Sequence, residues 1–111
     1  MSRLSEEMRQ RIVRNFMDLI IMKELRTSAG MSGYEATAVF NKKFRVLPSP
    51  GSVYSVLYAM EKKGLVESTA INGKKVYKLT RKGNTEVRQT LGDLNGILFF
   101  IKTILSEKSL L

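Results

Sequence analysis

The stretch from Ser49 to Glu86, SPGSVYSVLYAMEKKGLVESTAINGKKVYKLTRKGNTE, predicts a helix, a two-stranded hairpin and the start of another helix. Its first two residues are a favoured helix start, because serine caps the first turn and Pro50 suits the first helical position. Gly64 ends this helix, since glycine readily takes the left-handed conformation of a C-terminal cap. The sequence therefore predicts a helix over residues 50–63.

Two strands are predicted after this helix, from Leu65 to Thr69 and from Lys74 to Leu79. Asn72-Gly73 lies between them and is a strong hairpin signal. Thr80 is the predicted N-cap of the next helix. A helix followed by a basic hairpin is the second half of a winged helix-turn-helix, in which the helix enters a DNA groove and the hairpin lies on the adjacent backbone.

The flanking segments complete a mostly helical α+β fold. An apolar stripe predicts a first helix from about Ser5 to Arg26. Ser32 and Glu35 match a capping box and predict a second helix that runs to about Phe44. The predicted single domain, residues 1–111, contains an N-terminal helix (1–30), a helix-turn-helix (31–64), a wing hairpin (65–79) and a C-terminal dimerisation helix (80–111).

The predicted C-terminal helix carries two apolar stripes. The first follows heptad spacing and comprises Leu91, Leu94, Leu98, Ile101 and Leu105. The second comprises Ile97, Ile104 and Leu111. One stripe can cover the domain, and the other needs a further surface. We therefore expect a homodimer, with the heptad residues as its candidate contacts.

The chain is basic, with 19 Lys and Arg against ten Asp and Glu and a net charge of +9. The excess is uneven, because residues 65–90 hold six basic and two acidic side chains whereas residues 91–111 are neutral overall. A merely soluble basic protein would explain the total charge but not this segregation. The pattern favours a body that binds a polyanion and an end that binds protein.

Several classes of function are disfavoured by the composition. The chain has no cysteine and no histidine, so we expect no disulfide, no thiol catalysis, no metal site and no cofactor. Its acidic residues are scattered and no phosphate-binding loop is present, so we expect no enzyme. The N-terminus lacks signal-peptide features, and the longest apolar stretch, residues 94–105, is too short to span a bilayer. We expect a cytoplasmic protein without a membrane partner.

The candidate DNA contacts lie in the third helix, the hairpin and the end of the second helix. They are Ser49, Ser52, Tyr54, Ser55 and Lys62, then Asn72, Lys74 and Lys75, then Lys42, Lys43 and Arg45. The third helix offers no Arg, Asn or Gln for a bidentate base contact, so its discrimination is predicted to be weak or assisted by DNA shape.

Each of these candidates also has a structural interpretation. The two leading serines are helix caps in that interpretation, Tyr54 is a half-buried core aromatic, and the hairpin lysines protect a sheet edge. We expect Tyr34 to pack, and Tyr58 to be either exposed or directed at a dimer partner.

The sequence resembles the PadR-type winged-helix transcriptional regulators over about residues 10–105. The matching pieces are Gly33-Tyr34-Glu35, Ser49-Pro50-Gly51-Ser52-Val53-Tyr54, Leu57, Met60-Glu61, Gly64-Leu65-Val66, Tyr77, Leu79-Thr80 and Gly83. The resemblance implies a homodimer built by the two long terminal helices, which binds palindromic operators in double-stranded DNA and represses transcription, in some members until a small-molecule effector binds near the dimer interface. The chain departs from the family in having no tryptophan and in carrying Gly92 and Gly96 in its last helix, where we expect a kink or unusually close packing.

Three hypotheses follow. The first is a dimeric, sequence-biased DNA-binding transcriptional regulator, for which the resemblance implies repression. The second is an architectural protein that binds duplex DNA without choosing an operator. The third is a winged-helix module that uses its apolar last helix to bind an acidic protein partner.

Overall fold

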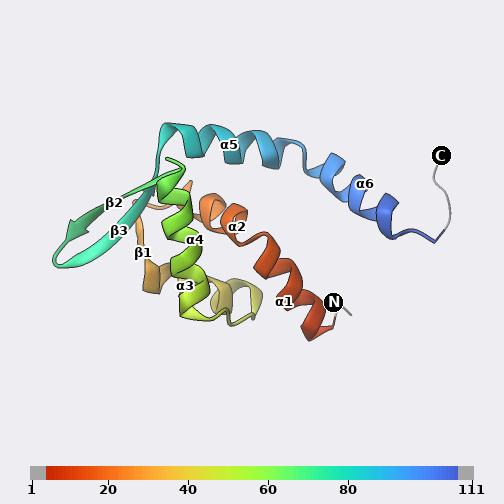
Figure 1. The fold of residues 1–111 in the computed structure, drawn as a ribbon, viewed down its shortest axis with the longest axis horizontal. Coiled ribbons are helices and arrows are strands. Elements are labelled where there is room, and N and C mark those ends of the chain that lie inside the picture. Colours follow the sequence, from red (N-terminus) through yellow and green to blue (C-terminus); the bar gives the residue numbers. More distant parts are fainter. Residues whose placement is uncertain (1–4, 108–111) are drawn as a thin grey trace.

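The computed structural model describes residues 5–107 and confirms the predicted α+β winged helix-turn-helix, with helices packed around a small antiparallel sheet (Figure 1). The elements, in chain order, are α1 (Glu6–Asn15), α2 (Met17–Leu25), β1 (Met31–Ser32), α3 (Gly33–Phe44), α4 (Pro50–Lys62), β2 (Val66–Ile71), β3 (Lys74–Leu79), α5 (Arg81–Gly92) and α6 (Leu94–Leu105). Within residues 5–107, no helix is long and apolar enough to cross a membrane.

The single N-terminal helix predicted over residues 5–26 is wrong, because the chain forms two helices that meet at Phe16. The Asn15 side chain donates a hydrogen bond to the Arg11 carbonyl at 2.8 Å, and the Asp18 carboxylate accepts one from the next backbone N–H at 2.8 Å. Such local bonds compete with the helical ladder. Phe16 accordingly has a non-helical backbone, with φ −112° and ψ 19°.

The predicted starts of α3 and α4 are confirmed. The Ser32 hydroxyl accepts from the Glu35 N–H at 3.1 Å, and the Glu35 carboxylate accepts from the Ser32 N–H at 2.9 Å, which completes the capping box. The Ser49 hydroxyl accepts from the Ser52 N–H at 3.1 Å, with Pro50 at the first helical position. Local capping therefore fixes where both helices of the helix-turn-helix begin.

The hairpin is also confirmed, and its strands pair in the register set by a two-residue turn. Asn72 and Gly73 have φ values of 52° and 78°, as a type I′ turn requires. β1, which the sequence did not predict, pairs with β3 and makes the strand order β1-β3-β2. Two residues are too short for an alternating pattern to identify.

The single C-terminal helix predicted over residues 80–111 is wrong, because α5 ends at Gly92 and α6 begins at Leu94. Asp93 joins them with φ −107° and ψ 28°. Glycine is a poor helix former, so the chain bends here at little cost. Thr80 does cap α5, accepting from the N–H three residues later at 3.0 Å. Leu111, predicted for the second stripe, lies outside the described residues.

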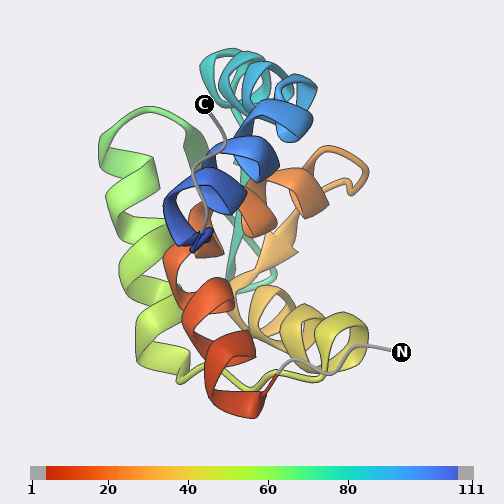
Figure 2. The ribbon, with the colours of Figure 1, turned by 90° about the vertical axis from the view of Figure 1, so that its right-hand side faces the viewer.

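The core lies between α2, α3, α4, α5 and the sheet. Its largest fully buried side chains are Phe40, Ile21, Met22, Leu57, Val46, Val53, Val66 and Val87. In contrast, α6 has no buried residue. Figure 1 shows the hairpin at one end of the molecule and α6 at the other, along an axis 55 Å long, and Figure 2 views the molecule from the end where α6 lies.

Candidate nucleic-acid interface

The outer face of α4 is the first component of the candidate interface. It lies opposite the buried Val53 and Leu57, and its exposed residues are Gly51, Ser55, Tyr58, Ala59 and Lys62. This face therefore carries hydroxyl groups, one aromatic ring and one ammonium group, but no guanidinium or carboxamide. Such a face is narrow enough for a major groove and has few hydrogen-bonding groups to read bases.

Tyr54 links the beginning of α4 to the beginning of α3. Its ring lies against Gly33, where an added Cβ would be 2.1 Å from the ring Cε1. Tyr54 is 47 % exposed, so one side of the ring packs and the other meets solvent. The glycine is required because any side chain at this position would displace the ring.

Tyr34 is 77 % exposed, so the expectation that it packs is wrong. The buried residues of α3, Ala36 and Phe40, lie on the opposite side of the helix. The helical period already predicts this exposure, because the buried residues two and six positions later point away from Tyr34. Its phenol therefore faces solvent near the start of α3.

The serines at the start of α4 have different roles. Ser49 is a helix cap, as its structural interpretation expected, and its hydroxyl lies 2.7 Å from that of Ser52. Ser55 is exposed one turn further along the helix. Ser55 therefore lies on the outer face, whereas the Ser49 and Ser52 hydroxyls hydrogen-bond to each other.

A network of side chains ties the hairpin to the end of α4. The Ser68 hydroxyl donates to the Glu61 carboxylate at 2.6 Å, and the Lys75 ammonium lies 3.6 Å from the same carboxylate. The Lys75 Nζ also lies 5.6 Å from the centre of the Tyr77 ring. The Ser68 bond lowers the pKa of Glu61, and the neighbouring Tyr77 and Glu61 raise the pKa of Lys75. Both groups of this ion pair are therefore charged at neutral pH.

The hairpin also approaches the start of α3. The pKa of Glu35 is lowered mainly by the hydrogen bond from the Ser32 backbone, and the charge of Lys74 adds to this shift. Lys74 and Asn72 are exposed at and beside the turn. The structure thus brings the predicted hairpin residues close to the helix-turn-helix.

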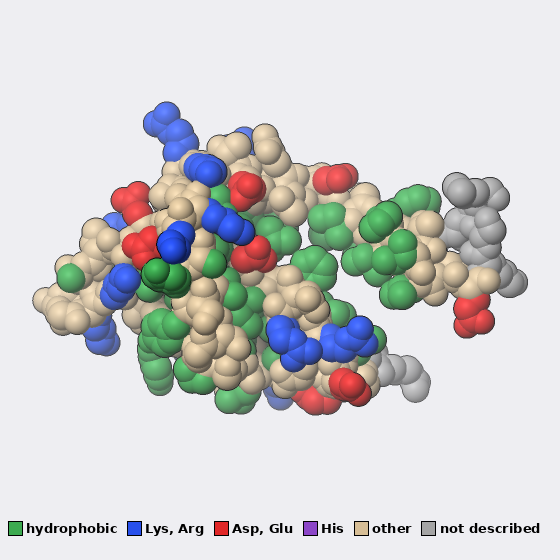
Figure 3. Space-filling view, viewed as in Figure 1, with side chains coloured by type: hydrophobic (Ala, Val, Ile, Leu, Met, Phe, Trp, Pro, Cys, Tyr) green, Lys and Arg blue, Asp and Glu red, His purple; other side chains and the backbone are tan. Residues whose placement is uncertain are grey.

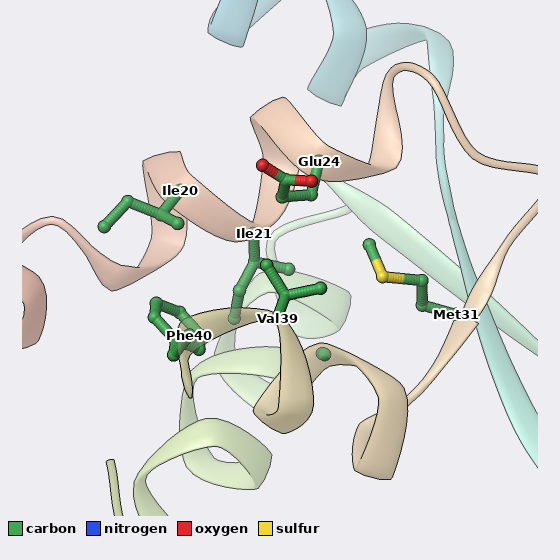
Figure 4. A pocket seen from close by; sticks show the side chains of 7 residues that line it. Ile20, Ile21, Glu24, Met31, Val39 and Phe40 are labelled. Atoms are coloured by element: carbon green, nitrogen blue, oxygen red, sulfur yellow. The ribbon is translucent and has the colours of Figure 1, made fainter. Parts of the chain in front are cut away.

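Lys43 does not join this surface. Its ammonium donates to the Glu24 carboxylate at 2.7 Å, which Lys23 also approaches at 3.1 Å. Glu24 lies beside apolar side chains of α2 and α3 (Figure 4) and is only 8 % exposed. Burial raises its pKa, but the bonds from both lysines outweigh burial and lower the pKa overall. Lys42 and Arg45, by comparison, are exposed at the C-terminal end of α3.

An apolar cleft of about 770 Å³ separates α1 and α2 from α5 and α6. All five heptad residues predicted from the sequence, residues 91, 94, 98, 101 and 105, line it, together with Ile12 and Phe16 on the opposite wall. Figure 3 shows hydrophobic side chains on both sides of this opening. The cleft lies at the end of the molecule opposite the hairpin, so the two predicted binding surfaces are separate.

The comparisons with known proteins bear on this geometry. Residues 21–89 match the sequence model of the transcriptional regulator PadR-like family. The chain belongs to the PadR-like family of transcriptional regulators. A comparison with curated protein sequences found no significant match.

Solved structures of PadR-like regulators share the fold. A PadR family regulator from Eggerthella lenta is 18 % identical, with a TM-score of 0.76 and 92 % of each chain covered. A PadR-like regulator from Bacillus cereus is 22 % identical, with a TM-score of 0.71, 88 % of this chain covered and 99 % of that one. Bacillus subtilis PadR, solved in complex with operator DNA, is 26 % identical, with a TM-score of 0.61, 68 % of this chain covered and 46 % of that one.

Two glycines of the PadR resemblance have a steric explanation in this structure. Gly33 makes room for the Tyr54 ring, and Gly83 lets α5 approach the backbone of Leu65, whose carbonyl oxygen would be 2.0 Å from an added Cβ. One residue of the α4 face, Tyr58, was absent from the predicted DNA contacts, although it lies off the buried stripe and four residues before Lys62. Residues four positions apart lie on the same face of a helix, so this spacing could have identified Tyr58 from the sequence.

Proposed function

We propose that this chain is a cytoplasmic, homodimeric transcriptional repressor that binds a two-fold symmetric operator. In each subunit α4 enters the major groove, and the β2–β3 hairpin lies on the flanking backbone. The observation that carries this proposal is the exposed face of α4 held beside a basic hairpin through Glu61. The operator complex of Bacillus subtilis PadR supports it by similarity.

The proposal of a dimer is based on the exposed apolar residues of α6. Leu98 is 55 % exposed, and α6 has no buried residue although most of its side chains are apolar. We propose that α6 of a second copy enters the cleft between α1 and α6, which would cover both apolar walls. Two-fold symmetry then predicts half-sites about 10 base pairs apart, centre to centre.

The first test is selection of bound duplexes from a random library, followed by salt titration of the selected site. We expect a palindrome whose affinity falls steeply with salt, because the lysines displace counterions from phosphates. The pair Lys74→Ala/Lys75→Ala should weaken binding at least tenfold. Lys102→Ala, which removes one positive charge from α6, is the control for each single variant, Lys74→Ala and Lys75→Ala, and should leave affinity nearly unchanged.

Two outcomes would contradict the proposal. Tight, salt-sensitive binding without any enriched sequence would favour an architectural protein, which the absence of bidentate base readers on α4 also suggests. No duplex binding at about 50 mM salt would leave the protein-interaction module as the better account.

A further inference from the structure

The outer face of α4 has one aromatic side chain, that of Tyr58. It is 60 % exposed, and the next residue, the exposed Ala59, lies about 100° further round the helix. The remaining positions hold a glycine, a serine and Lys62. Any recognition of bases by this face therefore depends mainly on a ring, a methyl group and a hydroxyl.

Lys62 determines how the Tyr58 ring is presented. Its Nζ lies 5.2 Å from the centre of the ring, a cation–π distance. The lysine therefore lies over one face of the ring. Tyr58 nevertheless stays 60 % exposed, so much of the ring is accessible to a ligand of α4.

The major groove has one apolar feature that such a surface can select, the C5-methyl group of thymine. Adenine, guanine and cytosine are distinguished by donors and acceptors that favour amide or guanidinium partners. We propose that Tyr58 determines specificity by burying a thymine methyl group. This inference rests on the proposed function, and it adds to it the base that α4 selects.

The other two exposed tyrosines, Tyr54 and Tyr34, do not lie at the centre of the outer face of α4. The Tyr54 ring packs against Gly33 at the junction with α3, and Tyr34 belongs to α3. Tyr34 is more exposed than Tyr58, so a matched substitution there separates the effect of position from the effect of losing an exposed ring.

The test compares two duplexes of about 30 base pairs, one alternating dA·dT and one alternating dA·dU. They have the same charge and pairing but differ in the methyl group. For the natural chain we expect the dA·dT duplex to bind about fourfold more tightly when one subunit buries a methyl group, and about fifteenfold more tightly when both subunits do. Tyr58→Ala should reduce this ratio to about one.

Two further variants complete the design. Tyr58→Phe keeps the ring and should keep the ratio, and Tyr34→Ala should keep it as well. Circular dichroism melting of each variant checks that folding is unchanged, which the exposure of both residues leads us to expect. Any change in duplex stiffness caused by uracil affects all variants alike, so only the dependence on Tyr58 counts as support.

The outcomes distinguish this inference from the proposed function. Binding of both duplexes with equal affinity by the natural chain, or a ratio that survives Tyr58→Ala, would overturn the inference and leave DNA binding intact. Failure to bind either duplex at low salt would overturn both.

Discussion

The body of the molecule, from α2 to α5, and the terminal helix α6 use apolar residues in opposite ways. In the body, Phe40 and Leu57 are fully buried within the chain's own core. In α6, Leu98, Phe99 and Phe100 are all exposed. Burial of apolar surface is the main favourable contribution to folding. The body is thus complete as a folded unit, whereas α6 gains stability only when another surface covers it.

The largest predicted effect is the loss of folding stability caused by a substitution in the core of the body. Phe40→Ala leaves a cavity in the core, and we expect it to lower the free energy of unfolding by about 3–5 kcal/mol in urea titrations. Phe99→Ala is the matched change in α6, on a residue outside the cleft, and should cost less than about 0.5 kcal/mol. Similar losses for both variants would contradict the distinction between body and α6.

The next effect should come from α6. Leu98→Asp places a charge in the apolar cleft, and we expect it to weaken the proposed dimer at least 100-fold, because an unpaired carboxylate is costly to desolvate. Analytical ultracentrifugation across a concentration series measures this change. Asn95→Asp adds the same charge outside the cleft, and a dimer that both variants weaken equally would argue against the cleft as the interface.

A smaller effect should come from the contact between α3 and α4. Gly33→Ala would force the Tyr54 ring aside, and we expect DNA affinity to fall about tenfold while the free energy of unfolding changes by less than about 1 kcal/mol. Fluorescence anisotropy with the selected duplex provides the measurement. Unchanged affinity for Gly33→Ala would show that the ring position is unimportant.

The smallest predicted effect is a pH-dependent contribution of Glu24 to the free energy of unfolding. Its pKa is lower in the folded chain than the usual value of 4.5, so its ionisation stabilises the fold above that pH and this contribution is lost as the pH falls through the folded pKa. We expect Glu24→Gln to cost about 1 kcal/mol at pH 7 and progressively less as the pH is lowered toward the folded pKa and below it. Urea unfolding across a pH series tests this, with exposed Glu67→Gln as control; a cost independent of pH would contradict it.

Local sequence signals predicted most of the body. Serine caps, Pro50 and the Asn72-Gly73 turn act over a few residues, and each defined an element that the structure confirms. The two predicted long helices failed for one shared reason. Apolar periodicity continues across Phe16 and Asp93 even though the backbone breaks there, so periodicity alone cannot locate either bend.

The candidate site was less predictable from sequence. The period of α4 identified its exposed face, but the partners of Lys43 and Lys75 depend on tertiary packing. Lys43 of α3 meets Glu24 of α2, and Lys75 of β3 meets Glu61 of α4. A lysine in a sequence signals charge, and only the fold shows whether that charge is already paired.

The bend at Asp93 has a consequence for how the protein would measure distance along DNA. When α6 pairs two copies as proposed, the rigid path from the bend through α5 fixes the separation of the two α4 helices. One residue inserted into α5 would advance the helix by about 1.5 Å and rotate α6 by about 100°. The two reading helices would then lose phase with the turn of the duplex. In the proposed dimer, the length of α5 would therefore set the operator spacing, independent of the bases that α4 contacts.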